Sequence, residues 1–378
     1  MRRGNRQRSF PHAHAMARTG SGRGTGQYRT RRKANLMSAT MQFGVMQRGV
    51  FEWGDDMSAH FDELMEQARV LDKLGYDSIT TGSHFSTFPH REFMQVPYLC
   101  RVMAEAPNVR LNAGIVLLSL HNPLEVAENF AAMDVMSGGR VIFGCALGYR
   151  DVEYKGFGIK KGEGVARFEE NLEAIKRLWA EEKVSMKGSR FELDEAVVSL
   201  PLVQRPHPPI WIGANADNAV RRAARLGDCW YLNPHQNLPT LSRQMDLYRV
   251  ELDKLGRPFP AELPIRREVF CAPSHDQAIK IAAPYIKAQY DLYKTWGQDK
   301  AMAKGDQDLS MDYEDLARDR FIVGDPDEVA EEMLHYHRVL GVNHIIMSVQ
   351  GVGMPQAQVL DTFQLMAEEV FAKVRRAL

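Results

Sequence analysis

The chain has 378 residues, of which 44% are hydrophobic and 25% charged, a composition typical of globular proteins rather than disordered or fibrous ones. Its 48 Lys and Arg equal its 48 Asp and Glu, so it lacks the excess positive charge of a nucleic-acid-binding protein. No apolar run reaches the roughly 18 residues that a membrane-spanning helix needs. We therefore expect neither nucleic acid nor a membrane among its partners.

Residues 1–36 differ from the rest of the chain. They contain ten of the Lys and Arg, no Asp or Glu, and no apolar periodicity. This composition predicts a disordered basic tail, or a translation start annotated too early, with the working start at Met37 or Met41. Removing the tail leaves 38 basic against 48 acidic residues, so the expected folded domain, 41–378, is mildly acidic.

The four cysteines are far apart in the sequence and form no Cys-x-x-Cys pair. They are Cys100, Cys145, Cys229 and Cys271, and three of them fall in predicted strands. This spacing favours buried free thiols over disulfides or a metal site, and hence a reducing compartment such as the cytoplasm.

From residue 41 onward, apolar strand patterns alternate with amphipathic helix patterns. The predicted strands are 42–46, 77–82, 109–118, 140–147, 210–213, 229–232, 265–271 and 343–348. The predicted helices are 57–74, 94–106, 123–136, 165–182, 215–226, 239–255, 325–340 and 355–377. Two insertions interrupt the alternation: 184–208, which looks like a hairpin, and 285–320, which is polar and partly helical. Eight such units predict a closed (β/α)8 TIM barrel rather than a doubly wound open sheet.

The stretch 137–158 shows most clearly where function should lie. An apolar run, 141–147, follows two glycines and opens at Gly148 into the polar segment 149–154. This is the pattern of a strand buried on both faces that ends in a polar loop. Because α/β barrels carry their active sites at the carboxyl ends of the strands, we expect the functional residues in such loops.

Few side chains after the strands could carry chemistry. The candidates are His84, His121, Asn122, Tyr149, Arg150, Asp151, Glu153, Trp230, Tyr231 and Asn233. These loops hold no cluster of His and carboxylates for a catalytic metal. The predicted strands contain no Lys for a Schiff base, and the chain has no GxSxG nucleophile motif.

Residues 213–216, Gly-Ala-Asn-Ala, close a strand and open a helix. Backbone N–H groups and the helix dipole would then face one point, as in phosphate sites. A simple N-cap by Asn215 explains the same pattern, so both interpretations stay open here.

Five segments, taken together, resemble the bacterial luciferase-like flavin-dependent oxidoreductases. They are GYDSITTGSHF (75–85), NAGIVLLSLHNPLEVAENFAAMDVMSGGRVIFGCALGYRDVEYKGFG (112–158), RFEENLEAIKRLW (167–179), VQRPHPPIWIGANADNAVRRAARLGDCW (203–230) and RFIVGDPDEVAEEMLHYHRVLGVNHIIM (320–347). The resemblance extends from about residue 41 to 378. Each motif is weak alone, but their order is specific to the family, although not to a substrate.

The resemblance implies a barrel with an insertion before its last helix–strand unit, usually dimeric, and a flavin or deazaflavin at the carboxyl ends of the strands. It implies a β-bulge with a non-proline cis peptide at Ala113-Gly114, behind the flavin ring. His84 matches the family's active-site histidine. The segments that hold the ring and the phosphate match Ala146, Leu147, Gly148 and Tyr149, and Ile212, Gly213, Asn215 and Ala216.

Two positions depart from the family pattern. An Arg for the phosphate is common at the position of Leu147, and a Ser or Thr at that of Ala216. Backbone amides or Arg150 would have to replace them. The reactive Cys of true luciferases would fall on Ala146, which argues against light emission.

The chain has no Rossmann fingerprint for a nicotinamide cofactor. We therefore expect a two-component monooxygenase that receives reduced FMN from a separate reductase and oxidises a small organic substrate with oxygen, with His84 as hydrogen-bonding or proton-donating group. A deazaflavin-dependent dehydrogenase on the same fold is one alternative. The other is a non-catalytic flavin-binding barrel, which a His84 buried away from any cavity would favour.

Overall fold

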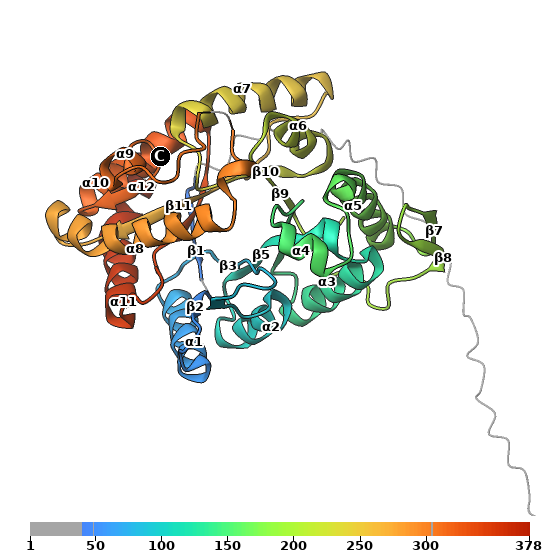
Figure 1. Ribbon diagram of the computed structural model, residues 1–378, viewed down its shortest axis with the longest axis horizontal. Coiled ribbons are helices and arrows are strands. Elements are labelled where there is room, and N and C mark those ends of the chain that lie inside the picture. Colours follow the sequence, from blue (N-terminus) through green and yellow to red (C-terminus); the bar gives the residue numbers. More distant parts are fainter. Residues whose placement is uncertain (1–39, 48, 304) are drawn as a thin grey trace, which may run out of the picture. The chain divides into compact units, whose positions relative to one another are not determined.

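Eight parallel strands form a closed ring in the computed structural model, which describes residues 40–47, 49–303 and 305–378 (Figure 1). They are β1 (Gln42–Met46), β3 (Ser78–Thr81), β5 (Arg110–Leu117), β6 (Val141–Ala146), β9 (Ile210–Ala214), β10 (Cys229–Leu232), β11 (Pro264–Cys271) and β13 (His344–Ser348). Each pairs in parallel with the next, and β13 pairs back to β1. The predicted (β/α)8 barrel is confirmed, and the open sheet is excluded because no edge remains.

Helices surround this ring on all sides (Figure 1). The helices that follow the strands are α1 (Met57–Lys73), α2 (Gln95–Glu105), α3 (Pro123–Ser137), α5 (Gly164–Ala180), α6 (Asp217–Leu226), α7 (Leu238–Lys254), α10 (Pro326–Leu340), α11 (Gln356–Leu365) and α12 (Phe371–Ala377). A π-helical turn, Met366–Val370, joins the last two. Their bounds agree with the predicted helices to within a few residues.

Strand residues alternate between the barrel interior and the layer under the helices. On β10, Tyr231 belongs to the inner apolar cluster, whereas Trp230 and Leu232 belong to the outer core. The inner cluster comprises Met46, Ile142, Trp211, Cys229, Tyr231 and Ile346. This cluster fills part of the barrel interior, and its members Met46 and Tyr231 also line a cavity at the carboxyl ends of the strands.

Both predicted insertions exist, but the second differs from its prediction. The first carries the antiparallel hairpin of β7 (Val184–Lys187) and β8 (Glu192–Ala196). The second begins earlier than residue 285, with the 21-residue helix α8 (His275–Thr295), and continues through α9 (Tyr313–Ala317) to β12 (Ile322–Gly324), which pairs with β11. Pro284 lies inside α8 and obscured it, because proline removes a helical hydrogen bond.

Two short elements had no counterpart in the predictions. The first is a two-stranded ribbon of β2 (Phe51–Glu52) and β4 (His90–Arg91), and the second is α4 (Asp151–Gly156), directly after β6. Cys145, Cys229 and Cys271 are buried in strands, Cys100 is half-buried, and all four are free thiols. The predicted tail, 1–36, lies outside the described residues. Among the described helices none combines the length and apolarity that crossing a bilayer requires.

Candidate active site

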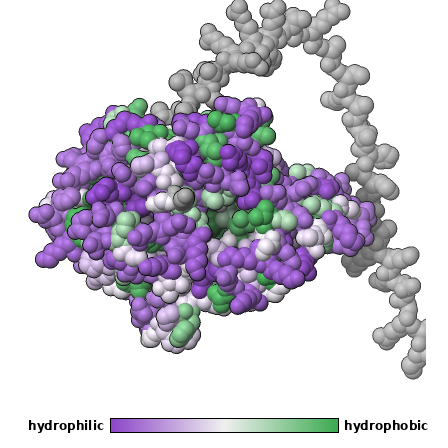
Figure 2. All heavy atoms as spheres, turned by 45° about the horizontal axis from the view of Figure 1, so that its top comes forward, coloured by the Kyte–Doolittle hydropathy of each residue, from purple (hydrophilic) through white to green (hydrophobic). Residues whose placement is uncertain are grey.

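A cavity of about 310 Å³ opens at the carboxyl ends of the barrel strands. Its apolar side includes Met46, Ile115, Leu117, Leu147 and Ile212. Figure 2 shows a mainly hydrophilic surface in which apolar residues gather around a central hollow. An apolar pocket with a few polar groups is the usual form of a cofactor or substrate site.

The predicted site residues meet in this cavity. His84 lines it, and so do Gly114, Ala146, Leu147, Gly148, Tyr149, Ile212, Gly213, Asn215 and Ala216. Ala113 does not, because its side chain is fully buried in the outer core. The roles assigned to these residues stay predictions, although ten of the eleven positions lie around one space.

His84 follows β3 and is held from both sides. Its backbone N–H donates to Glu92 Oε2 over 2.6 Å, and its Nδ1 lies 2.8 Å from Glu153 Oε1. An ionised carboxylate can only accept, so Nδ1 carries the proton beside an ionised Glu153. Nε2 then has its lone pair available at the cavity.

Glu153 is 1% exposed and lies in α4. The same oxygen that faces His84 also accepts the backbone N–H of Phe85 over 3.0 Å, and Arg150 Nη1 lies 3.6 Å away. The carboxylate thus ties the loop after β3 to the loop after β6. A buried, paired carboxylate of this kind orients a histidine rather than reacting itself.

Arg150 does not replace the missing phosphate-binding side chains. Its guanidinium donates to the backbone carbonyls of Phe85 and Ser86 at 2.8 and 3.1 Å, and stacks 4.6 Å above the ring of Trp296. Arg150 is buried in these contacts and is absent from the residues that line the cavity. Of the two alternatives for the phosphate contact, Arg150 is therefore excluded and the backbone amides remain.

The bulge in β5 lies where the resemblance places it, but the cis bond is one residue later. The register of β5 against β6 shifts between Ala113 and Val116, and the cis peptide joins Gly114 to Ile115 rather than Ala113 to Gly114. A Cβ on Gly114 would lie 2.6 Å from Thr80 Cγ2, so only glycine fits. The cavity therefore meets bare backbone at this point.

The amino end of α6 contributes a second stretch of backbone. Its N-cap is Ala216, whose side chain makes no capping bond, and Asn215 instead accepts from Gln236 and Gln244 through its carbonyl. The N-cap interpretation of Asn215 is thus wrong. The first N–H groups of a helix have no intrahelical acceptor and attract anions.

Arg222, one turn further along α6, also lines the cavity and is 9% exposed. Its Nε donates to Glu169 over 2.8 Å, which holds the guanidinium in place. Asp217, in the first turn of α6, is paired with Arg243, and hydrogen bonds from Arg243 and Gln244 lower its pKa to about 2. Arg222 is the cation that sequence reasoning missed at this end of the cavity.

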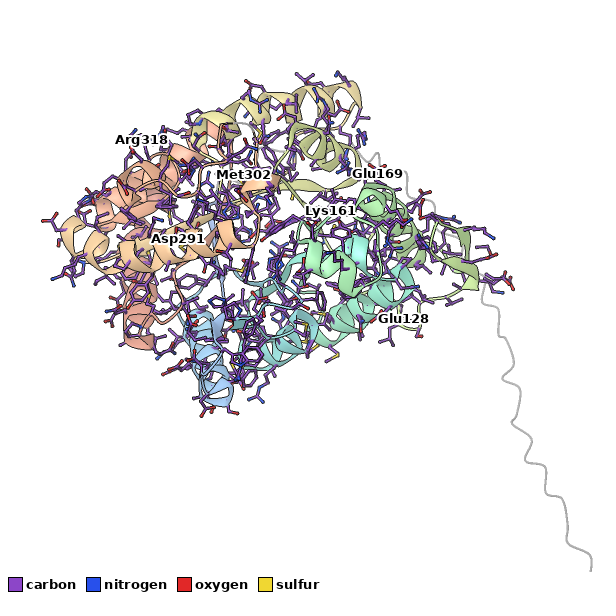
Figure 3. All side chains as sticks on the ribbon, viewed as in Figure 1. Glu128, Lys161, Glu169, Asp291, Met302 and Arg318 are labelled. Carbon is purple, nitrogen blue, oxygen red and sulfur yellow. The ribbon has the colours of Figure 1, made fainter. Side chains whose placement is uncertain are left out.

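Four other candidates lie away from the cavity. Asn122 is the N-cap of α3, and its side chain accepts from the Leu124 N–H over 2.9 Å. His121 packs against Phe85 and Phe157, where burial lowers the pKa of its imidazole. Asp151 is exposed and pairs with Lys161, which is labelled in Figure 3. Trp230 faces the outer core and donates to the carbonyl of Ala214. Tyr231 of β10 and Asn233 and His235 of the loop after it line the cavity.

A Ser–His–Glu chain lies at the opposite, amino end of the barrel. Ser78 Oγ is 2.8 Å from His344 Nε2, and His344 Nδ1 is 2.9 Å from Glu262, which also binds Arg110. Ser78 and His344 are fully buried and do not line the cavity, so this array stabilises the barrel rather than cleaving a substrate. No group of described His, Cys, Asp and Glu residues could hold a metal ion.

Several cavity residues had no local signal in the sequence. Arg266 lies inside β11, Tyr293 and Trp296 lie on or just after α8, and Arg222 lies in the middle of a helix. The one available signal for Arg266 was its charge inside a predicted buried strand. Charged residues are rarely buried without a function or a partner.

The chain is similar to flavin- and deazaflavin-dependent enzymes. It is 25% identical over 242 residues, 62% of this chain, to the oxygenase component of a flavin-dependent trigonelline monooxygenase from Acinetobacter baylyi. It is 23% identical over 334 residues to an F420-dependent glucose-6-phosphate dehydrogenase from Amycolatopsis mediterranei, covering 83% of this chain and 94% of that protein. The chain spans only 66% of the trigonelline oxygenase and 56% of another curated relative.

Among solved structures, the monooxygenase RslO1 from Streptomyces bottropensis superposes with a TM-score of 0.75 at 26% identity, covering 88% of this chain and 99% of that one. Residues 41–343 match the sequence family described as luciferase-like monooxygenase. This match covers most of the chain, includes all the described residues that line the cavity, and agrees with the closed barrel. The chain belongs to the luciferase-like monooxygenase family.

Proposed function

We propose that the protein is a flavin-dependent monooxygenase that uses reduced FMN and oxygen to oxidise a small organic substrate. The observation that carries this proposal is His84, oriented by the buried Glu153, at the wall of a largely apolar cavity. Family membership and the similarity to the trigonelline oxygenase support it. His84 also lies at the cavity, unlike the buried histidine that would favour a non-catalytic barrel.

The cavity fits a flavin in three respects. Gly82, Gly114, Gly148 and Gly213 bring bare backbone to its wall, where a flat ring can approach closely. Arg222 and the amino end of α6 provide positive charge for a phosphate. Apolar walls exclude water, and reduced flavin would supply the electrons that activate oxygen.

The chain's own residues would bind the phosphate of the cofactor, orient the His84 ring and transfer a proton at the reacting atoms. Backbone amides at Ala216 and Asp217, with Arg222, would hold the phosphate. His84 would donate or accept a proton through Nε2 at the reacting atoms, and Glu153 would keep its ring in place. We also propose that a separate reductase supplies the reduced FMN, that the protein forms a homodimer and that it is located in the cytoplasm.

A deazaflavin-dependent dehydrogenase is the second candidate. The alignment that covers 83% of this chain with an F420-dependent dehydrogenase favours it. In that reaction hydride moves without oxygen, and His84 would act as acid or base. The same cavity could hold FMN or a deazaflavin, so the identity of the bound cofactor distinguishes the monooxygenase from the dehydrogenase.

The deciding experiment is a titration of the purified protein with FMN and a deazaflavin, each oxidised and reduced. Tighter binding of reduced FMN, followed by oxygen consumption coupled to substrate oxidation when a flavin reductase is added, supports the monooxygenase. Preference for the deazaflavin with no oxygen uptake assigns the protein to the dehydrogenases. His84→Ala should abolish turnover and leave flavin binding intact, and full turnover of that variant would refute the role of His84.

A further inference from the structure

One wall of the cavity is polar, and none of the residues expected to hold the cofactor lies on it. This wall is built by Tyr231 on β10, Asn233 just after it, Arg266 on β11, and Gln289 and Tyr293 on α8. The expected cofactor contacts lie on β5, β6, β9 and the loops that follow them. The polar wall is therefore available to the second molecule that the reaction needs, the organic substrate.

Arg266 presents a fixed guanidinium to this wall. Its Nε donates to Ser348 Oγ over 2.8 Å and its Nη2 to Tyr293 Oη over 3.0 Å, so two hydrogen bonds hold the fork. Nη1 has no partner among the described residues, and the side chain is 14% exposed. Burial alone lowers the pKa of Arg266, but Tyr293 and Glu268 outweigh it and raise the pKa above its usual value. The guanidinium stays charged, and its Nη1 has no acceptor among the residues that the structure describes.

Tyr231 is the second side chain of this wall with an unused hydrogen-bonding group. It is 5% exposed, and its hydroxyl has no hydrogen-bond partner among the described residues. Leu232 pairs with Ile265 across β10 and β11, so Tyr231 and Arg266 point to the same, inner face. Burial raises the pKa of Tyr231, so the phenol keeps its proton as a donor. A buried hydroxyl without a partner is destabilising, and a hydrogen bond to a ligand oxygen would remove that penalty.

We propose that Arg266 and Tyr231 form a subsite for a carboxylate group of the organic substrate. The inference rests on the proposed function and names the substrate class: small organic acids, bound with the carboxylate at this wall and the reacting atom toward His84. A guanidinium N–H and a phenol O–H are both donors, and a carboxylate offers two oxygens that can accept from them.

Charge decides between a carboxylate and a phosphate ester. Arg266 is the one cation among the described residues of this wall, and Glu268 lies 3.9 Å from its Nη2. A phosphate monoester carries about −1.5 to −2 charge at pH 7 and would remain under-compensated there. A carboxylate carries a single charge, so it demands less of the positive charge that Arg266 retains beside Glu268.

The test uses the FMN-saturated protein and three ring probes: benzoate, benzamide and phenyl phosphate. Binding is followed through the absorbance change of the bound flavin. Benzoate should bind at least about tenfold more tightly than benzamide, the size expected for a hydrogen bond to a charged group. Arg266→Met should abolish that preference, and Tyr231→Phe should reduce it. Glu268→Gln, which removes the nearest negative charge, should strengthen benzoate binding and leave benzamide unchanged.

Matched controls separate this subsite from the cofactor site. Arg222→Met should weaken FMN relative to riboflavin and leave the benzoate preference intact, and Arg318→Met, on the surface, should change neither. Equal binding of benzoate and benzamide, tighter binding of phenyl phosphate, or loss of FMN itself in Arg266→Met would each overturn the inference. Absence of FMN binding in the wild type would instead refute the proposed function, before any probe is added.

Discussion

At the scale of single residues, the hydrogen bond between His84 and Glu153 is the feature on which the proposed chemistry depends. The carboxylate is buried beneath the loop after β3 and accepts from both the imidazole and the Phe85 N–H. It does not touch the cavity, so Glu153 is a positioning residue. Its effect on catalysis would pass entirely through the orientation and tautomer of His84.

Glu153→Gln keeps an acceptor oxygen but removes the charge that selects the Nδ1–H tautomer. We expect kcat to fall by about tenfold or more, since a positioned acid–base group contributes about 10²–10⁴-fold. The dissociation constant for FMN should not change. Steady-state kinetics with a flavin titration check this, with Glu163→Gln, an exposed partner of Arg190, as control. A variant with wild-type kcat would show that Glu153 only stabilises the loop.

Glu262, at the amino end of the barrel, determines part of the acid sensitivity. Burial alone raises its pKa, but hydrogen bonds and charge from His344 and Arg110 outweigh it and lower the pKa from 4.5 to about 2. A carboxyl whose pKa falls on folding stabilises the native state above its unfolded pKa, by up to about 3 kcal/mol here, and this contribution is lost as pH falls from about 4.5 to 2.

We therefore expect Glu262→Gln to be destabilised relative to wild type at pH 7, with the difference shrinking below pH 4.5. Urea unfolding at pH 7, 5, 4 and 3 measures it. Glu181→Gln, whose carboxylate pairs with Arg177 at the surface, is the control. A difference in unfolding free energy that stays constant with pH would contradict the linkage.

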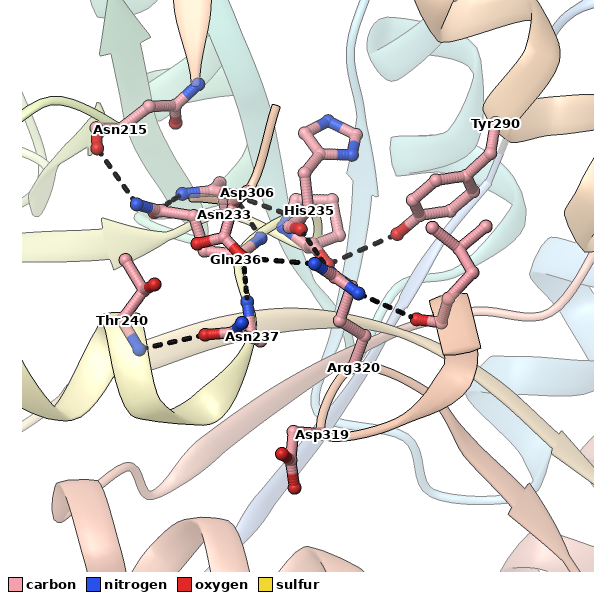
Figure 4. Close-up of polar contacts among 12 residues, drawn as sticks. Asn215, Asn233, His235, Gln236, Asn237, Thr240, Tyr290, Asp306, Asp319 and Arg320 are labelled. Carbon is pink, nitrogen blue, oxygen red and sulfur yellow. Dashed lines mark hydrogen bonds and ion pairs between the residues drawn. The ribbon is translucent and has the colours of Figure 1, made fainter. Parts of the chain in front are cut away.

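At the scale of elements, the second insertion matters most, because its first part covers the cavity. Trp296, Gln298 and Ala301 line it. The insertion is anchored by Arg320, which donates to the His235 carbonyl over 2.9 Å and to Asp306 over 3.0 Å (Figure 4). Both members of this ion pair are buried, at 3% and 0% exposure of their side chains. The ion pair lies within the insertion, and hydrogen bonds from Arg320 to the His235 carbonyl and from the Asn237 N–H to Asp306 join it to the loop after β10.

Asp306→Asn leaves the Arg320 charge buried without its counter-ion. Losing one partner of a buried ion pair costs about 3–5 kcal/mol. We expect this loss to destabilise the insertion locally, which would speed hydrogen exchange in residues 296–320 and weaken flavin binding. Asp315→Asn is the control within the same insertion, because its partner Arg318 projects from the surface (Figure 3). Equal exchange in both variants would show that the pair does not anchor the insertion.

At the scale of the whole molecule, the last helices close the barrel against its first strands. Phe371 stacks on Phe43 of β1 with ring centres 3.9 Å apart, and Tyr76 donates to the Phe363 carbonyl over 3.0 Å. The two ends of the described chain therefore share one core. Removing a contact here should weaken the entire barrel rather than one element.

Phe371→Ala should destabilise the protein by about 3–5 kcal/mol, the usual cost of truncating a buried phenylalanine. Urea unfolding followed by tryptophan fluorescence and by far-UV circular dichroism should shift to the same lower midpoint. Leu378→Ala, at the exposed end of α12, should shift neither. Separate midpoints for the two probes would show that the carboxyl-terminal helices unfold independently.

Sequence alone determined the barrel, because strand and helix periodicities are local and their alternation leaves few topologies. Strand ends such as Gly148 and His84 also follow from local pattern, which is why most predicted site residues line one cavity. The sequence did not predict the full length of α8, because Pro284 interrupts its helical pattern.

Tertiary structure decided the rest. Arg150 contacts loop carbonyls rather than the cavity, and Glu153 reaches His84 across 69 positions of sequence. Arg266 acquires its role only because β11 lies beside β10 and beneath α8. A side chain's charge and hydrogen-bonding capacity are written in the sequence, but what it contacts depends on strand register and loop placement, which no local pattern specifies.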